Sequence, residues 1–68
     1  MNKNNIREMV EGIVEAADEL LNKADRDLVE QGQLIAYAES LSIIRDACAG
    51  YDLKEIGLDF DIDKKYLV

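Results

Sequence analysis

Residues 27–50 constrain the fold most, because as one helix they have two faces that need burial. A main apolar stripe recurs at three- and four-residue steps, and its members are Leu34, Tyr37, Ala38, Leu41, Ile44 and Cys48. A second stripe on the far side consists mostly of small residues: Val29, Gly32, Ala36, Ser40, Ile43 and Ala47. Only a strip through Glu39, Ser42 and Asp46 is polar. A surface helix carries one apolar stripe, so we expect neighbours to enclose this helix.

The chain has 68 residues, which form a single domain (residues 1–68) and supply few elements for such an enclosure. It contains one cysteine and therefore no intramolecular disulfide. Small domains without a disulfide or metal commonly reach stability by association. We therefore expect a homodimer or a higher oligomer, with the second stripe of the helix as its interface.

Another amphipathic helix is predicted over residues 5–24, with Asn5 as its cap and Glu8 completing a capping box. Its broad apolar stripe consists of Ile6, Met9, Val10, Ile13, Val14, Ala17, Leu20, Leu21 and Ala24. The opposite side carries Glu8, Glu11, Glu15, Asp18, Glu19 and Asn22. This pattern is typical of a helix with one face in water.

Two positions can hold the turn between the helices. One is residues 31–32, where Gly32 suits the left-handed conformation that follows a helix. The other is residues 25–27, where Asp27 and Glu30 form a second capping box. We favour residues 25–27, because helices over 5–24 and 28–49 can then cover each other along their length. The predicted fold is all-α, an antiparallel hairpin that pairs with a second hairpin as a four-helix bundle.

Residues 51–68 are predicted to form a C-terminal arm after a stop at Gly50. Asp52 begins a single turn over residues 53–56, which Gly57 ends. Apolar and acidic residues then alternate with strand periodicity, and the apolar ones are Leu58, Phe60 and Ile62. These three form a possible partner-binding arm, which packs on the helices or pairs with the same arm of a second copy. We expect residues 64–68 to be loosely held.

The sequence predicts no catalytic, cofactor-binding or metal site. Histidine, the usual general base, is absent, so Cys48 has no activating partner. The acidic run Asp59, Asp61 and Asp63 does not match a calcium loop, because Lys64 occupies the position that requires glycine. No glycine-rich phosphate loop is present. We therefore expect a protein that is not an enzyme.

The net charge of −7 disfavours direct binding of nucleic acid and of anionic membranes. No continuous apolar run follows the N-terminus, so neither a signal peptide nor a membrane span is expected. A single cysteine fits the reducing cytoplasm. We expect a protein–protein interaction module. Its expected partner is a second copy of itself, and another protein is a further candidate partner. The alternative is an acidic mimic that inhibits a DNA- or RNA-binding protein through the row Glu8, Glu11, Glu15, Asp18 and Glu19.

Residues 32–66 resemble a group of short bacterial helical-hairpin proteins with no assigned function. The resemblance rests on a helix that begins Gly-Gln-Leu-Ile-Ala-Tyr at Gly32, and on a tail Ile-Gly-Leu-Asp-Phe-Asp at residues 56–61. It implies a hairpin fold and no site residues.

Overall fold

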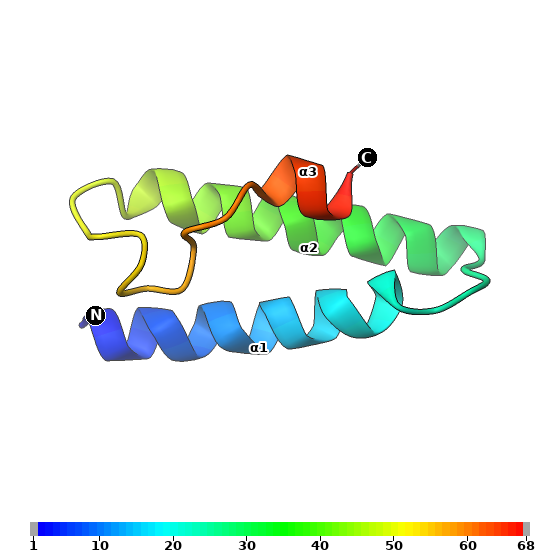
Figure 1. The fold of residues 1–68 in the computed structure, drawn as a ribbon, viewed down its shortest axis with the longest axis horizontal. Coiled ribbons are helices and arrows are strands. Elements are labelled where there is room, and N and C mark those ends of the chain that lie inside the picture. The colour runs from blue at the N-terminus through cyan, green and yellow to red at the C-terminus, as the bar shows by residue number, and fades with distance from the viewer. Residues whose placement is uncertain (1, 68) are drawn as a thin grey trace.

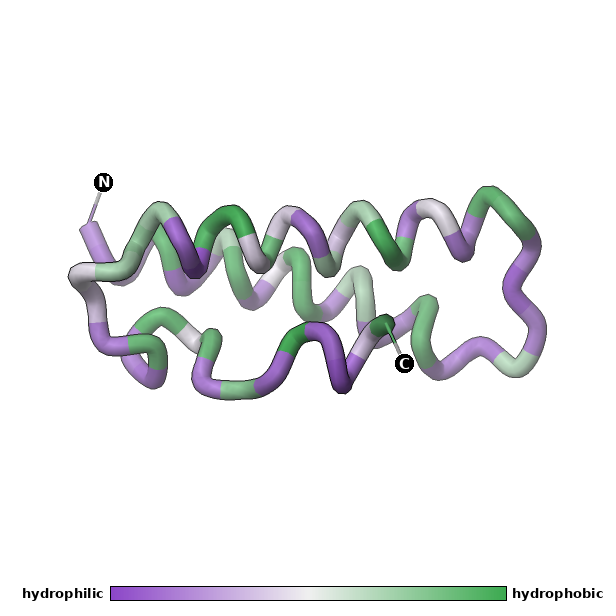
Figure 2. Tube along the Cα trace, turned by 90° about the horizontal axis from the view of Figure 1, so that it is seen from above, coloured by the Kyte–Doolittle hydropathy of each residue, from purple (hydrophilic) through white to green (hydrophobic). Residues whose placement is uncertain are grey.

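The computed structural model describes residues 2–67, in which three helices are present (Figure 1). They are α1 (Lys3–Leu21), α2 (Leu28–Ala47) and the short α3 (Ile62–Tyr66). α1 and α2 lie antiparallel, and the segment after α2 returns along one side of the hairpin, with α3 beside α2 (Figures 1 and 2). No strand occurs within residues 2–67. The predicted all-α hairpin is confirmed.

The start and end of α1 both lie earlier than predicted. Asn2, not Asn5, is the N-cap, and its side chain accepts a hydrogen bond from the Asn5 backbone N–H at 2.9 Å. At the other end the Arg26 guanidinium donates to the carbonyl oxygens of Leu20 and Leu21, at 3.0 and 3.1 Å. Because the last carbonyls of a helix lack partners within it, this arginine stabilises an end at Leu21.

The turn lies where the preferred prediction placed it. Asp27 caps α2, accepting from the Glu30 N–H at 2.8 Å, while the Glu30 carboxylate accepts from the Asp27 N–H at 3.2 Å. Lys23 pairs with Glu30 across the turn and holds the pKa of that carboxyl below its usual value. Gly32 lies within α2, so the alternative turn at residues 31–32 is wrong.

α2 ends at Ala47 with Cys48 as its cap, two residues before the predicted end. The predicted turn over residues 53–56 is confirmed, and Gly57 follows it with a φ of +81°. The Leu58 N–H donates to the Leu53 carbonyl at 2.8 Å, and the Gly57 N–H donates to the Lys54 carbonyl at 3.4 Å. These are the two bonds of a Schellman motif, which requires a residue in the left-handed region.

The extended arm predicted after Gly57 is wrong beyond Asp61. Asp61 caps α3 by accepting from the Lys64 N–H at 3.1 Å, so the chain becomes helical where alternation predicted a strand. Tyr66 in α3 is buried, so the prediction of a loosely held end fails there. Val68, the last residue of that prediction, lies outside the described residues.

One core joins all three helices and the turn. α1 contributes Ile6, Val10 and Ala17, and α2 contributes Leu34, Ala38 and Leu41. The rest of this buried core comes from the C-terminal segment: Ile56, Leu58, Ile62 and Tyr66. The main apolar stripe of residues 27–50 therefore faces the core as predicted.

Candidate interaction surface

The second stripe of α2, here called the outer stripe (Val29, Gly32, Ala36, Ser40, Ile43 and Ala47), lies at the surface. Val29 and Ile43 are 69% and 68% exposed. Ser40 is half-buried, and its hydroxyl donates to the Ala36 carbonyl at 2.8 Å. A Cβ atom built on Gly32 would meet nothing within 4 Å. The outer stripe is therefore an apolar helix face that no described part of the chain covers.

The flank of α1 next to this side of the hairpin is also apolar. It consists of Met9, Ile13, Ala16 and Leu20, here called the α1 flank. Met9 is 43% exposed, and the other three are half-buried. Successive residues of a helix are about 100° apart, which places these four on one side of α1.

A shallow hollow of about 320 Å³ joins the α1 flank to α2. Ala16 and Leu20 line it from α1, and Gln33 and Tyr37 line it from α2. Charged groups also line it, from Glu19 and from the Lys23–Glu30 pair. Because Gln33 lies one helical turn from Val29, the hollow connects the α1 flank with the outer stripe.

The opposite side of the hairpin is closed by the C-terminal segment. The Tyr66 hydroxyl donates to Asp18 Oδ1 at 2.7 Å, and Lys65 Nζ lies 3.2 Å from the same oxygen. The Phe60 and Tyr66 rings meet edge to face at 6.2 Å, with Lys65 Nζ 4.9 Å from the Phe60 ring centroid. Burial, the hydrogen bond to Asp18 and the negative charge of Asp18 raise the pKa of Tyr66. This cluster fixes α3 against both long helices.

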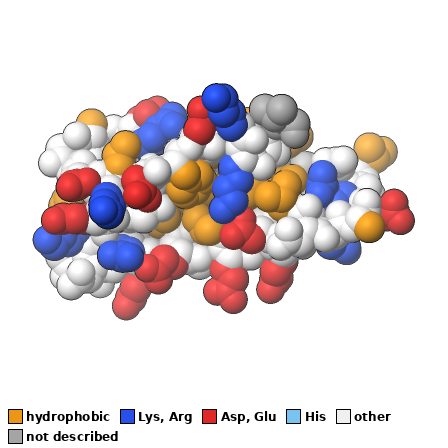
Figure 3. Space-filling model, viewed as in Figure 1, with side chains coloured by type: hydrophobic (Ala, Val, Ile, Leu, Met, Phe, Trp, Pro, Cys, Tyr) orange, Lys and Arg blue, Asp and Glu red, His pale blue; other side chains and the backbone are white. Residues whose placement is uncertain are grey.

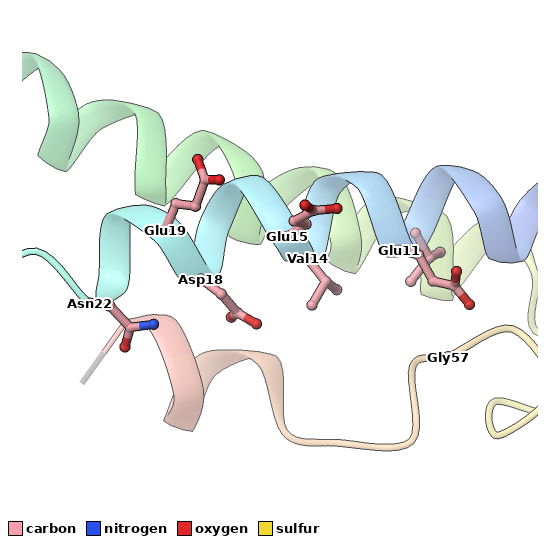
Figure 4. Close-up of a pocket in the computed structure, with 8 residues that line it drawn as sticks. Glu11, Val14, Glu15, Asp18, Glu19, Asn22 and Gly57 are labelled. Atoms are coloured by element: carbon pink, nitrogen blue, oxygen red, sulfur yellow. The ribbon is translucent and has the colours of Figure 1, made fainter.

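A groove of about 410 Å³ runs between α1 and the segment that starts at Gly57 (Figure 4). Its apolar lining comes from Val10 and Val14, and carboxylates project around it, as Figure 4 shows for Glu11, Glu15, Asp18 and Glu19. Acidic side chains also follow the edge that α1 forms in the space-filling view (Figure 3).

The acidic row on α1 is partly neutralised by the chain itself. Arg7 Nε lies 2.9 Å from Glu11 Oε1, and Asp18 is held by Lys65 and Tyr66. Within residues 2–67, the side-chain carboxylates of Glu15 and Glu19 have no ion-pair or hydrogen-bond partner.

The predicted partner-binding arm does not present its side chains at the surface. Leu58 and Ile62 are 1% and 0% exposed, and Phe60 is half-buried against the core. The arm therefore packs on its own helices, which was one of the two predicted arrangements. The signal that identifies this packing is the four-residue spacing of Leu58, Ile62 and Tyr66, which is helical rather than alternating.

No group of three or more histidine, cysteine, aspartate or glutamate side chains within residues 2–67 is placed to hold a metal ion. The free thiol of Cys48 is half-buried on the core side of α2. No described helix combines the length and apolarity that a transmembrane helix needs.

No known family model, curated protein or solved structure matches this chain. The resemblance of residues 32–66 to short bacterial hairpin proteins therefore assigns no family.

Proposed function

We propose that this protein is a non-enzymatic interaction module that binds a second copy of itself through the outer stripe of α2. The observation that carries the proposal is the exposure of Val29 and Ile43 on a helix face without charged residues. Contiguous apolar surface of this kind commonly marks a protein–protein interface. The resulting homodimer would be a four-helix bundle of two hairpins.

The residue sizes along the outer stripe support a helix-to-helix contact. Gly32, Ala36 and Ser40 are small, and two helices approach closely where their side chains are small. A symmetric dimer uses the same patch on both copies, so one exposed surface that includes the outer stripe is enough. A reducing cytoplasm would suit the free thiol of Cys48.

Two isoleucines on α2 provide a matched test. Ile43 lies on the outer stripe, whereas Ile35 is also exposed but lies beside Leu67, on the side that α3 covers. Light scattering should give twice the chain mass of 7.7 kDa for the wild type and for Ile35→Asp. It should give a monomer for Ile43→Asp, because a buried carboxylate without a partner opposes association. A monomeric wild type would contradict the proposal, and so would a dimeric Ile43→Asp.

The second candidate is an acidic mimic of nucleic acid that inhibits a DNA- or RNA-binding protein. The observation that favours it is the exposure of Glu15 and Glu19 without ion-pair partners inside residues 2–67. A pull-down should then capture basic nucleic-acid-binding proteins that duplex DNA displaces and that high salt releases, because salt screens exposed charges. Capture that resists both duplex DNA and salt would contradict this candidate.

A further inference from the structure

We infer that the α1 flank belongs to the same interface, so that Met9, Ala16 and Leu20 contact the second copy together with the outer stripe. This inference rests on the proposed self-association and names the surface that completes it. The helix concerned is α1, whose apolar stripe was predicted from the sequence only to pack against α2.

The first argument is the area that a stable dimer needs. α2 has 20 residues, so one face of it measures about 30 by 10 Å, or roughly 300 Å². Specific protein–protein interfaces bury about 800 Å² on each partner. The Cα trace extends 37 × 19 × 15 Å, so a face of the whole hairpin offers roughly 700 Å². The outer stripe alone is too small, and the α1 flank enlarges the apolar area that a second copy can cover.

The second argument is the distribution of charge. The chain carries −7, so two copies repel each other wherever their acidic groups meet. None of the ten residues of the outer stripe and the α1 flank is charged. The acids of α1 instead line the groove beside the C-terminal segment, as Glu11 and Glu15 do (Figure 4). The hollow between the two surfaces carries Glu19 and the Lys23–Glu30 pair, in which the opposite charges offset each other. A second copy therefore meets less net negative charge on this side than on the groove side.

The third argument is the hollow between the helices. Ala16, Leu20 and Tyr37 line a depression of about 320 Å³ together with Gln33, Glu19 and the Lys23–Glu30 pair, and no described residue fills it. Helix–helix interfaces pack ridges of side chains into grooves, so a depression with both apolar and polar lining suits an amphipathic side chain from a facing helix. The hollow joins the two apolar surfaces into one continuous contact.

The test compares three substitutions on α1 that each add one negative charge. Met9→Glu and Ala16→Glu place the charge on the α1 flank, at an exposed and a half-buried position. Asn4→Glu is the control, because Asn4 is exposed and lies more than 100° around the helix from these residues. Sedimentation equilibrium over a dilution series gives the dimer Kd of each variant, and circular dichroism checks that each variant is folded.

Both flank variants should raise the dimer Kd at least about tenfold, a change equivalent to about 1.4 kcal/mol. Asn4→Glu should leave the Kd within about threefold of the wild type. If Ala16→Glu unfolds the chain, the exposed Met9→Glu still decides the result.

A dimer that Ile43→Asp dissociates but Met9→Glu leaves intact would overturn this inference and leave the proposed function standing. A monomeric wild type would overturn both.

Discussion

The hydroxyl of Tyr66 offers a perturbation whose size follows from its surroundings. Tyr66 is 4% exposed, and its hydroxyl donates to Asp18 Oδ1 at 2.7 Å. Hydrogen bonds to charged groups contribute about 1.5–3 kcal/mol to stability. In Tyr66→Phe, Asp18 remains half-exposed and keeps Lys65 at 3.2 Å, so water and Lys65 limit the loss. We expect the lower end of the range, about 1.5 kcal/mol.

Thermal unfolding followed by circular dichroism measures this loss. The melting temperature of Tyr66→Phe should fall by about 6–12 °C, given the usual response of a domain of this size. All samples need the same protein concentration, because self-association makes the melting temperature concentration-dependent. Tyr37→Phe is the matched control, since the Tyr37 hydroxyl has no hydrogen bond within residues 2–67 and should change stability by less than about 0.5 kcal/mol.

A double-mutant cycle tests the reason for the loss. If the hydroxyl acts through Asp18, Tyr66→Phe should cost little more in a chain that already carries Asp18→Ala. Equal melting temperatures for Tyr66→Phe and Tyr37→Phe would refute the reasoning, and so would full additivity of the two substitutions in the cycle.

Three further predictions concern stability. Leu41→Ala should lower the free energy of unfolding in chemical denaturation by about 2–5 kcal/mol because Leu41 is fully buried, whereas Glu39→Ala on the exposed strip should change it little. Equal losses of stability would show that the assignment of the buried and exposed faces of α2 is wrong. Gly57→Ala should cost about 1–2 kcal/mol through its φ of +81°, since the added Cβ meets only Val10 Cγ1 at an ordinary 3.6 Å; an unchanged denaturation midpoint would contradict this. The fold raises the pKa of Tyr66, so the stability that its neutral hydroxyl contributes is complete below pH 10 and is lost at higher pH. The free energy of unfolding should therefore fall above about pH 10 more steeply in the wild type than in Tyr66→Phe. Parallel pH profiles of the two proteins would contradict that assignment.

The hairpin was predictable because its signals are local. Asp27 and Glu30 form a capping box through side chains three residues apart, which the sequence states directly. The main stripe through Leu34 and Leu41 follows the helical period and faces the core. The turn over residues 53–56 was also predicted to end at Gly57, and in the structure this glycine has the left-handed conformation.

The C-terminal segment was harder to predict because two periods overlap in it. Leu58, Phe60 and Ile62 fit a period of two, while Leu58, Ile62 and Tyr66 fit a step of four. Tertiary contacts decide between them: Leu58, Ile62 and Tyr66 are buried in the core, and Tyr66 donates a hydrogen bond to Asp18, 48 residues away in the sequence. The end of α1 at Leu21 likewise depends on Arg26, whose side chain returns to the helix from the turn.

One part of the candidate surface was predictable from the sequence and the other part was not. The outer stripe was identifiable from the spacing of Val29, Ala36 and Ile43, and the structure leaves these residues exposed. The α1 flank could not be distinguished from the core-facing residues of α1 in the sequence. Met9 and Leu20 belong to an apolar stripe that is broad enough to include both core residues and the surface residues beside them. Only the position of the C-terminal segment shows which side of that stripe stays uncovered (Figure 2).

The central claim is that a second copy covers the outer stripe, and nuclear Overhauser effects between copies test it most directly. A mixed sample of ¹³C-labelled and unlabelled protein allows contacts between copies to be filtered from contacts within one chain. We predict intermolecular effects from the methyl groups of Val29 and Ile43 at concentrations where the dimer is populated. Intramolecular effects between α1 and α2 without any intermolecular effect at Val29 or Ile43 would contradict the account.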